Sequence, residues 1–325
     1  MKLPRRRFLH LTAGAVALPA VSRVARAQAY PSRPVRIIAS TAPGGAPDIV
    51  ARLMGPWLSE RLGQQFVVEN RPGGGGNIGT EAVVRASPDG YTLLLVDPSG
   101  PINATLYEKL NFVFLRDIAP IASIIRFPYV VVVHPSVPTK TIPELVAYAR
   151  ANPRKINIGS PGIASGPHIA GELFKMMAGV DIVQVHYRGG APVMTDLLGG
   201  QVQVLFGTTS LTLEQIKSGR LRALAVTTAA RWEGLSEIPT VNEFIPGYEA
   251  SSVFGLGAPR NTPAEIIERL NNEVNAGLAD SKINARLTEL GGIVLPGSPV
   301  AFGKLLVEET EKWGKVIRAA NIKPE

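Results

Sequence analysis

The chain has 325 residues, of which 45% are hydrophobic, and it contains no cysteine. The lack of cysteine excludes disulfides, thiolate metal sites, a catalytic thiol and a lipid anchor on a cysteine. Six of the 34 basic residues lie within residues 1–27, which contain no acidic residue, so residues 28–325 carry 28 basic and 26 acidic residues. This near balance gives no indication of a nucleic-acid or membrane-surface partner, and we expect neither.

Residues 1–27 have the pattern of a cleaved export signal, with a basic start, an apolar run over residues 11–21 and small residues at 25–27. The apolar run is too short to span a bilayer. The arginine pair at 5–6, followed by Phe8 and Leu9, resembles a twin-arginine signal, and a Sec signal with a basic head is the alternative. We expect a soluble periplasmic protein without a lipid anchor.

Short β-branched runs alternate with helical patterns along the rest of the chain. We predict strands at 35–39, 66–69, 92–96, 129–134, 156–159, 183–186, 202–206, 221–227 and 252–257, and helices at 47–61, 78–85, 142–150, 167–177, 191–198, 264–279 and 299–320. This alternation predicts an α/β fold with parallel sheets covered by helices. No repeat and no low-complexity linker divides the chain, so two lobes would be joined by short strands.

The helix predicted at 264–279 has a recognisable start. Thr262 would be its N-cap, Pro263 its first residue, and Glu265 would complete a capping box. We interpret this C-terminal region as structural.

Four nearly uncharged loops follow predicted strands: STAPGGAPD (40–48), DPSGPINATLY (97–107), GSPGIASGPH (159–168) and FGTTSL (206–211). Open α/β sheets bind ligands at this edge. In the first loop, Gly44 and Gly45 could present bare N–H groups beside a helix start, where an anion can dock. The alternative is a tight turn with no ligand. Backbone N–H groups and hydroxyls would suit a carboxylate held without an arginine.

Enzymatic interpretations have weaker support. The glycine loop at 71–80 lacks the Lys-Ser/Thr pair of a phosphate-binding loop, and Ser165 lacks the flanking glycines of a nucleophile elbow. His168 and Glu172 could share a metal, but no third ligand has a recognisable spacing. We interpret His168 instead as a donor within its loop or a cap of its own helix. The sequence predicts no cofactor, no metal site and no catalytic residue, and an exported hydrolase using Ser165 and His168 is the minor alternative.

Three more residues allow two interpretations each. Asp48 would cap the helix that begins near Pro47, or else face a ligand. Arg188 would meet an anion or form a salt bridge, and Tyr187 would line the pocket or pack beside it.

Six segments, taken in order, closely resemble the substrate-binding proteins of tripartite tricarboxylate transporters, often called the Bug receptor family. They are APGGAPDIVAR, VVENRPGGGGNIGTEAVVRASPDGYTLL, INATLYEKLNF, GSPGIASGPHIAGELF, VHYRGGAPVMTDLLGGQV and IKSGRLRALAVTTAAR. The resemblance covers essentially all of the chain after residue 27. It implies a type II periplasmic binding protein fold, in which two α/β lobes joined by two crossover strands close on a small carboxylate. The implied crossovers lie near 129–134 and 252–257, giving a first lobe of 28–128 and 252–325 and a second lobe of 129–251.

The resemblance also implies the site. Backbone amides of residues 43–46 and of the loop around 160–165 would hold the ligand carboxylate, partly through water. The full set of expected ligand-binding residues is Thr41, Ala42, Pro43, Gly44, Gly45, Ala46, Asp48, Asn77, Ser99, Ser160, Ile163, Ala164, Ser165, His168, Tyr187 and Thr208.

Two residues depart from the pattern of many relatives. Thr41 replaces a phenylalanine, which would enlarge or polarise that wall, and Gly207 replaces an aspartate that could meet a ligand ammonium. Both changes argue against an amino-acid ligand. We therefore expect a monomeric, non-enzymatic receptor that delivers a small organic anion to the membrane subunits of a tripartite transporter. A sensor that signals to a partner protein through the same fold is the alternative.

Overall fold

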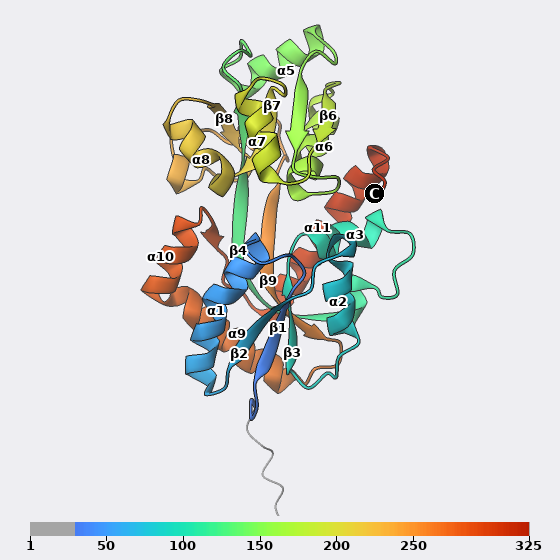
Figure 1. The fold of residues 1–325 in the computed structure, drawn as a ribbon, viewed down its shortest axis with the longest axis vertical. Helices are drawn as coiled ribbons and strands as arrows, with labels where there is room; N and C mark the ends of the chain where they lie inside the picture. The colour runs from blue at the N-terminus through green and yellow to red at the C-terminus, as the bar shows by residue number, and fades with distance from the viewer. Residues whose placement is uncertain (1–29, 325) are drawn as a thin grey trace, which may run out of the picture.

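The computed structural model describes residues 30–324 (Figure 1). The predicted export signal, residues 1–27, lies outside the described residues. The strands are β1 (Val35–Ala39), β2 (Phe66–Asn70), β3 (Thr92–Val96), β4 (Ile118–Val133), β5 (Asn157–Ser160), β6 (Val183–His186), β7 (Val204–Thr208), β8 (Arg222–Val226), β9 (Ser251–Pro259) and β10 (Ile293–Val294). The α-helices are α1 (Ala46–Leu62), α2 (Asn77–Val84), α3 (Ser99–Leu106), α4 (Phe114–Asp117), α5 (Ile142–Ala151), α6 (Gly166–Ala178), α7 (Gly190–Leu198), α8 (Thr209–Lys217), α9 (Ala264–Ala279), α10 (Ser281–Glu289) and α11 (Pro299–Ala319).

The strands follow one another in the order β2-β1-β3-β9-β4-β7-β5-β6. In the first lobe β1 pairs in parallel with β2 and β3, and β9 pairs antiparallel with β3. In the second lobe β5 pairs in parallel with β6 and β7. Strand–helix alternation places helices against both sets of strands, as the sequence predicts. The α/β fold class is confirmed.

Two long strands join the lobes, and Figure 1 shows β4 and β9 running side by side from one lobe into the other. Residues 118–128 of β4 pair with β9, whereas Tyr129 and the following residues pair with β7 and β8. The strand thus changes partners between Pro128 and Tyr129. The predicted two-lobe arrangement with two crossover strands is confirmed.

The first half of β4 escaped prediction because Pro120 and Pro128 interrupt it, and proline cannot donate to a β-ladder. The structure accommodates Pro120 beside a register shift against β9. Four helices, α3, α4, α8 and α10, were also missed. Residues 97–107 were read as a loop, but residues from Ser99 to Leu106 are helical.

The predicted capping box of α9 is wrong. Helix α9 begins at Ala264 after Pro263 and has no side-chain cap. The hydroxyl of Thr262 instead donates to the carbonyl of Pro259 at 2.8 Å, because the chain turns away from β9 there.

The last helix, α11, contacts both lobes. It packs on α3 of the first lobe and on α6 of the second (Figure 1). Its side chain Trp313 belongs to the same buried cluster as Leu106 of α3 and Phe174 of α6. Within residues 30–324, none of the helices combines the length and apolarity that a membrane span requires.

Candidate functional site

In the first lobe, the predicted site residues lie at the carboxyl edge of β1, β2 and β3, because parallel strands end on the same side of their sheet. Hydrogen bonds tie the loops at this edge together. Asp97, which follows β3, accepts from Ser99 N at 2.8 Å and from the hydroxyl of Ser40 at the end of β1. Asn103 of α3 donates to Asn77 Oδ1 at 3.0 Å. Ser99 and Asn77 are thus held by two sets of hydrogen bonds, both of which include residues of α3.

The turn between β1 and α1 uses both glycine amides internally. Gly44 has a φ of 83°, and its N–H donates to Asp48 Oδ2 at 2.9 Å. The N–H of Gly45 donates to the carbonyl of Ala42 at 3.3 Å. For these two amides the structure shows the tight turn that was the alternative interpretation. Among the described residues, the N–H of Ala46 at the start of α1 has no hydrogen-bond partner.

Asp48 fixes this turn. Its carboxylate is 3% exposed and also accepts from Arg52 Nε at 2.9 Å. Burial raises the pKa of Asp48, but the hydrogen bonds from Arg52 and Gly44 outweigh that effect and leave the pKa below its ordinary value. Arg52 also contacts Asn70, which donates to the carbonyl of Thr41. Asp48 thus has a structural role, but it holds the preceding turn and Arg52; α1 has no side-chain cap, so the predicted capping of this helix is not observed.

The two departures from the relatives' pattern have different surroundings. The hydroxyl oxygen of Thr41 is buried and has no hydrogen-bond partner among the described residues. It lies against Gly45, where a Cβ would be 3.0 Å away, so it is turned into the loop. Gly207 lies in β7 opposite Val130, and a Cβ there would come within 2.3 Å of the Thr212 methyl group.

In the second lobe, the loop after β5 is held by side chains. Ser165 caps α6, accepting from His168 N at 3.4 Å and donating to the carbonyl of Gly162 at 2.7 Å. Ala164 has a positive φ of 56°, and its N–H donates to His168 Nδ1 at 2.8 Å. Ser160 is fully buried, and its hydroxyl lies 2.7 Å from His186 Nδ1. The amide of Ala164 is therefore occupied, and Ile163 beside it is half-buried.

His168 acts as an acceptor and not as the donor that the sequence suggested. Burial above all, with help from His186 and Lys175, lowers the pKa of His168 to about 3. The ring is thus neutral at physiological pH, and its Nδ1 is free of a proton to accept from Ala164. No hydrogen bond joins the Ser165 hydroxyl to the His168 ring, which weakens the hydrolase alternative. The described residues contain no group of three side chains able to hold a metal ion.

Tyr187 and Arg188 follow β6 at the same edge. The Tyr187 hydroxyl donates to Asp196 Oδ2 at 2.7 Å, and burial together with this carboxylate raises the Tyr187 pKa to about 12. Arg188 is exposed and has no ion pair within residues 30–324. The salt bridge that was one interpretation of Arg188 is not present.

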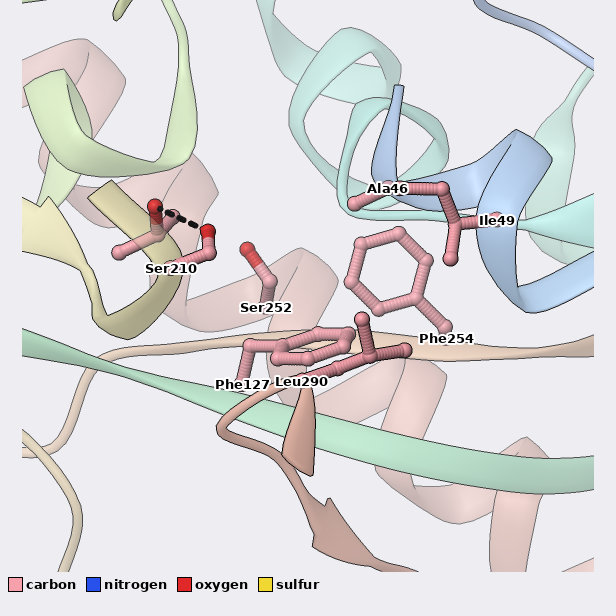
Figure 2. Close-up of a pocket in the computed structure, with 8 residues that line it drawn as sticks. Ala46, Ile49, Phe127, Ser210, Ser252, Phe254 and Leu290 are labelled. Atoms are coloured by element: carbon pink, nitrogen blue, oxygen red, sulfur yellow. Dashed lines mark hydrogen bonds between the residues drawn. The ribbon is translucent and has the colours of Figure 1, made fainter. Parts of the chain in front are cut away.

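A pocket lies where the two edges meet (Figure 2). Ala46 and Ile49 of α1 face it from the first lobe, and Thr208 and Ser210 from the second. The crossover strands close it from below with Phe127, Ser252 and Phe254, and the end of α10 adds Leu290. A second hollow on the second lobe shares Thr208 and Ser210 with it and is also lined by Pro161, Pro167, Gly190, Leu205, Gly207 and Leu211.

Of the predicted site residues, only Ala46 and Thr208 line the pocket between the lobes. The other predicted residues shape the two edges around it. Sequence reasoning missed the remaining lining residues, because most of them lie on the crossover strands or at two helices that were not predicted, α8 and α10; Ile49 lies on the predicted first helix, beyond its glycine loop. The missed residues are Ile49, Phe127, Ser210, Ser252, Phe254 and Leu290.

Helices α1, α7 and α8 begin at these edges without a side-chain cap, after Gly45, Gly189 and Thr208. The first N–H groups of an α-helix have no partner inside the helix, and the helix dipole makes this end positive. The pocket can therefore favour an anion although no charged side chain lines it.

Comparison with known proteins identifies the family. Residues 50–322 match the tripartite tricarboxylate transporter family receptor. BugT of Bordetella pertussis is 32% identical over 311 residues, which cover 95% of both chains. The structure of Rpa4515 from R. palustris with adipate is 37% identical, with a TM-score of 0.79, covering 91% of this chain and all of that one. MatC (Rpa3494) from Rhodopseudomonas palustris, with bound malate, is 29% identical with a TM-score of 0.75, covering 89% of this chain and all of that one. The chain therefore belongs to the tripartite tricarboxylate transporter receptor family.

Proposed function

We propose that this protein binds a small organic carboxylate between its lobes and presents it to the membrane subunits of a tripartite transporter. The observation that carries this proposal is the pocket itself, which is uncharged, lies between the lobes and is bordered by uncapped helix starts. Two relatives support the ligand class, because their structures contain adipate and malate.

The forces available at the site suffice for such a ligand. A hydrogen bond to a charged group contributes roughly 1.5 to 3 kcal/mol, and micromolar binding needs about 8 kcal/mol. Four or five backbone or hydroxyl donors would reach this value once the closed lobes exclude water. Candidate donors are the Ala46 N–H and the first N–H groups of α7 and α8.

Binding would work by lobe closure and would break no bond. The proposed lobes comprise residues 28–128 with 252–325, and residues 129–251. The change of strand partners after Pro128 supports this division. A ligand that contacts both edges favours the closed state by its differential affinity, and the transporter would recognise that state. We also propose that the protein works in the periplasm, as a monomer and without catalysis.

A thermal-shift screen tests the ligand class. Adipate and malate are the probes, with glucose and putrescine as uncharged and cationic controls. A ligand at 100 times its dissociation constant should stabilise the folded protein by about 2.7 kcal/mol. A shift with a carboxylate alone supports the proposal, and a shift with glucose or putrescine but no carboxylate refutes it.

An introduced negative charge tests where the ligand binds. Ala46→Asp puts a carboxylate at the first turn of α1, inside the pocket, where it should repel an anionic ligand while the helix start tolerates it. Val300→Asp is the matched control, because Val300 is in the first turn of α11 and 82% exposed outside the pocket. Binding that survives Ala46→Asp would place the ligand elsewhere.

A further inference from the structure

Two phenyl rings form the floor of the pocket. Phe127 and Phe254 lie on the neighbouring crossover strands β4 and β9 and meet edge to face, with ring centroids 5.4 Å apart. Both side chains are largely buried in the core of the first lobe. Their positions are therefore set by the protein core before any ligand arrives.

A large apolar side chain faces these rings from α1. Ile49 is 39% exposed although it lines the pocket, and Figure 2 shows it on the side of Phe254 away from Ser210. Leu290, at the end of α10, lies beside Phe127. Covering Ile49 with a ligand would remove apolar surface from water, which favours binding.

The side-chain hydroxyls of the pocket already have hydrogen-bond partners. The Ser252 hydroxyl is 2.6 Å from the Tyr129 hydroxyl, and Thr208 Oγ1 is 3.1 Å from Ser210 Oγ. None of the described residues that line the pocket has a charged side chain. A hydroxyl group on the ligand that reached the rings would lose its water and find few partners.

We infer that Phe127, Phe254, Ile49 and Leu290 form an apolar subsite for the carbon skeleton of the ligand. The protein would therefore select carboxylates with an unsubstituted hydrocarbon chain or ring over hydroxylated ones. This inference rests on the proposed function and specifies which carboxylates the site prefers.

Isothermal titration with matched acids tests the selectivity. Galactarate is the six-carbon diacid adipate with four added hydroxyls, and gluconate is hexanoate with five added hydroxyls. We expect each hydrocarbon acid to bind at least tenfold more tightly than its hydroxylated partner, since an unpaired hydroxyl costs about that factor. Two added methylenes, from butanoate to hexanoate, should tighten binding about tenfold.

Variants locate the subsite. Ile49→Ser should weaken adipate and hexanoate binding about tenfold and leave galactarate binding unchanged. Val307→Ser is the matched control, because Val307 is 42% exposed on helix α11 and does not line the pocket, so its affinities should not change. Thermal melts of both ligand-free variants establish that they fold.

The outcomes separate the two proposals. If hydroxylated acids bind as tightly as their hydrocarbon partners, the apolar subsite is refuted while carboxylate binding stands. The same conclusion follows if Ile49→Ser changes both classes equally or changes neither. If neither these acids nor malate binds, the proposed function itself fails and the subsite fails with it.

Discussion

Asp48 offers the sharpest test of how the first site loop is held. Asp48→Ala removes the acceptor of the Gly44 N–H and the partner of Arg52, both at 2.9 Å. A hydrogen bond to a charged group contributes roughly 1.5 to 3 kcal/mol. The Arg52 side chain is 54% exposed, so its ion pair with Asp48 adds only about 0 to 1 kcal/mol. We expect the ligand-free protein to lose about 2 to 3 kcal/mol of unfolding free energy.

Urea denaturation of the ligand-free protein measures this loss, which should lower the midpoint without changing the slope. Asp48→Asn keeps one oxygen for Gly44 but loses the charge, so its free energy of unfolding should fall by less than that of Asp48→Ala. Glu289→Ala is a surface control: Glu289 pairs with Arg286 at 2.6 Å where both side chains are more than half exposed. Its ion pair should contribute under about 1 kcal/mol.

The pH dependence of the Asp48 effect has a definite sign. The pKa of Asp48 is lower in the folded protein than in the unfolded chain, so the carboxylate stabilises the fold above the unfolded value of about 4. This contribution disappears as the pH falls through the lower folded pKa. An Asp48→Ala protein that is as stable as the wild type yet fails to bind ligand would refute the structural role and place Asp48 against the ligand.

Further predictions concern the same loops. Between pH 6.5 and pH 5 the free energy of unfolding should fall by about 2 kcal/mol more in the wild type than in His168→Gln, since the buried neutral ring of His168 resists protonation. Equal pH profiles would contradict this. Thr41→Val should raise the free energy of unfolding by about 1 kcal/mol and so raise the urea midpoint, because it replaces an unpaired buried hydroxyl. A lower midpoint would show that the hydroxyl has a partner. Gly166→Ala should lower the free energy of unfolding by about 1 to 3 kcal/mol and with it the melting temperature, because its Cβ would lie 1.9 Å from the buried Tyr129 hydroxyl. An unchanged melting temperature would show that Tyr129 can move.

The order of strands and helices was largely predictable from the sequence. The bounds predicted for β1, β3 and β6 agree with the structure, because a short β-branched run between turn residues is a local signal. The first half of β4 was not predictable in this way. Its prolines signal a break locally, and only pairing with β9 makes the segment a strand.

The loops predicted after β1 and β5 lie at the carboxyl edges of the two sets of parallel strands, whereas the loops predicted at 97–107 and 206–211 are largely helix or strand. The sequence did not show which polar atoms of these loops are free of hydrogen-bond partners. The Gly44 amide is occupied by Asp48 and the Ala164 amide by His168, through hydrogen bonds that span four residues and depend on the folded turns. The sequence shows which donors exist, and only their folded geometry shows which remain available.

The sequence by itself determined the family, the α/β alternation and the nearly uncharged character of the loops, because motifs and periodicity are properties of neighbouring residues. The tertiary structure alone decided what the pocket is made of. Phe127, Phe254 and Leu290 are far apart along the chain and meet only because β4 and β9 pair and α10 ends beside them. A strand face or helix end becomes part of a binding surface only when the packing of distant segments leaves it uncovered.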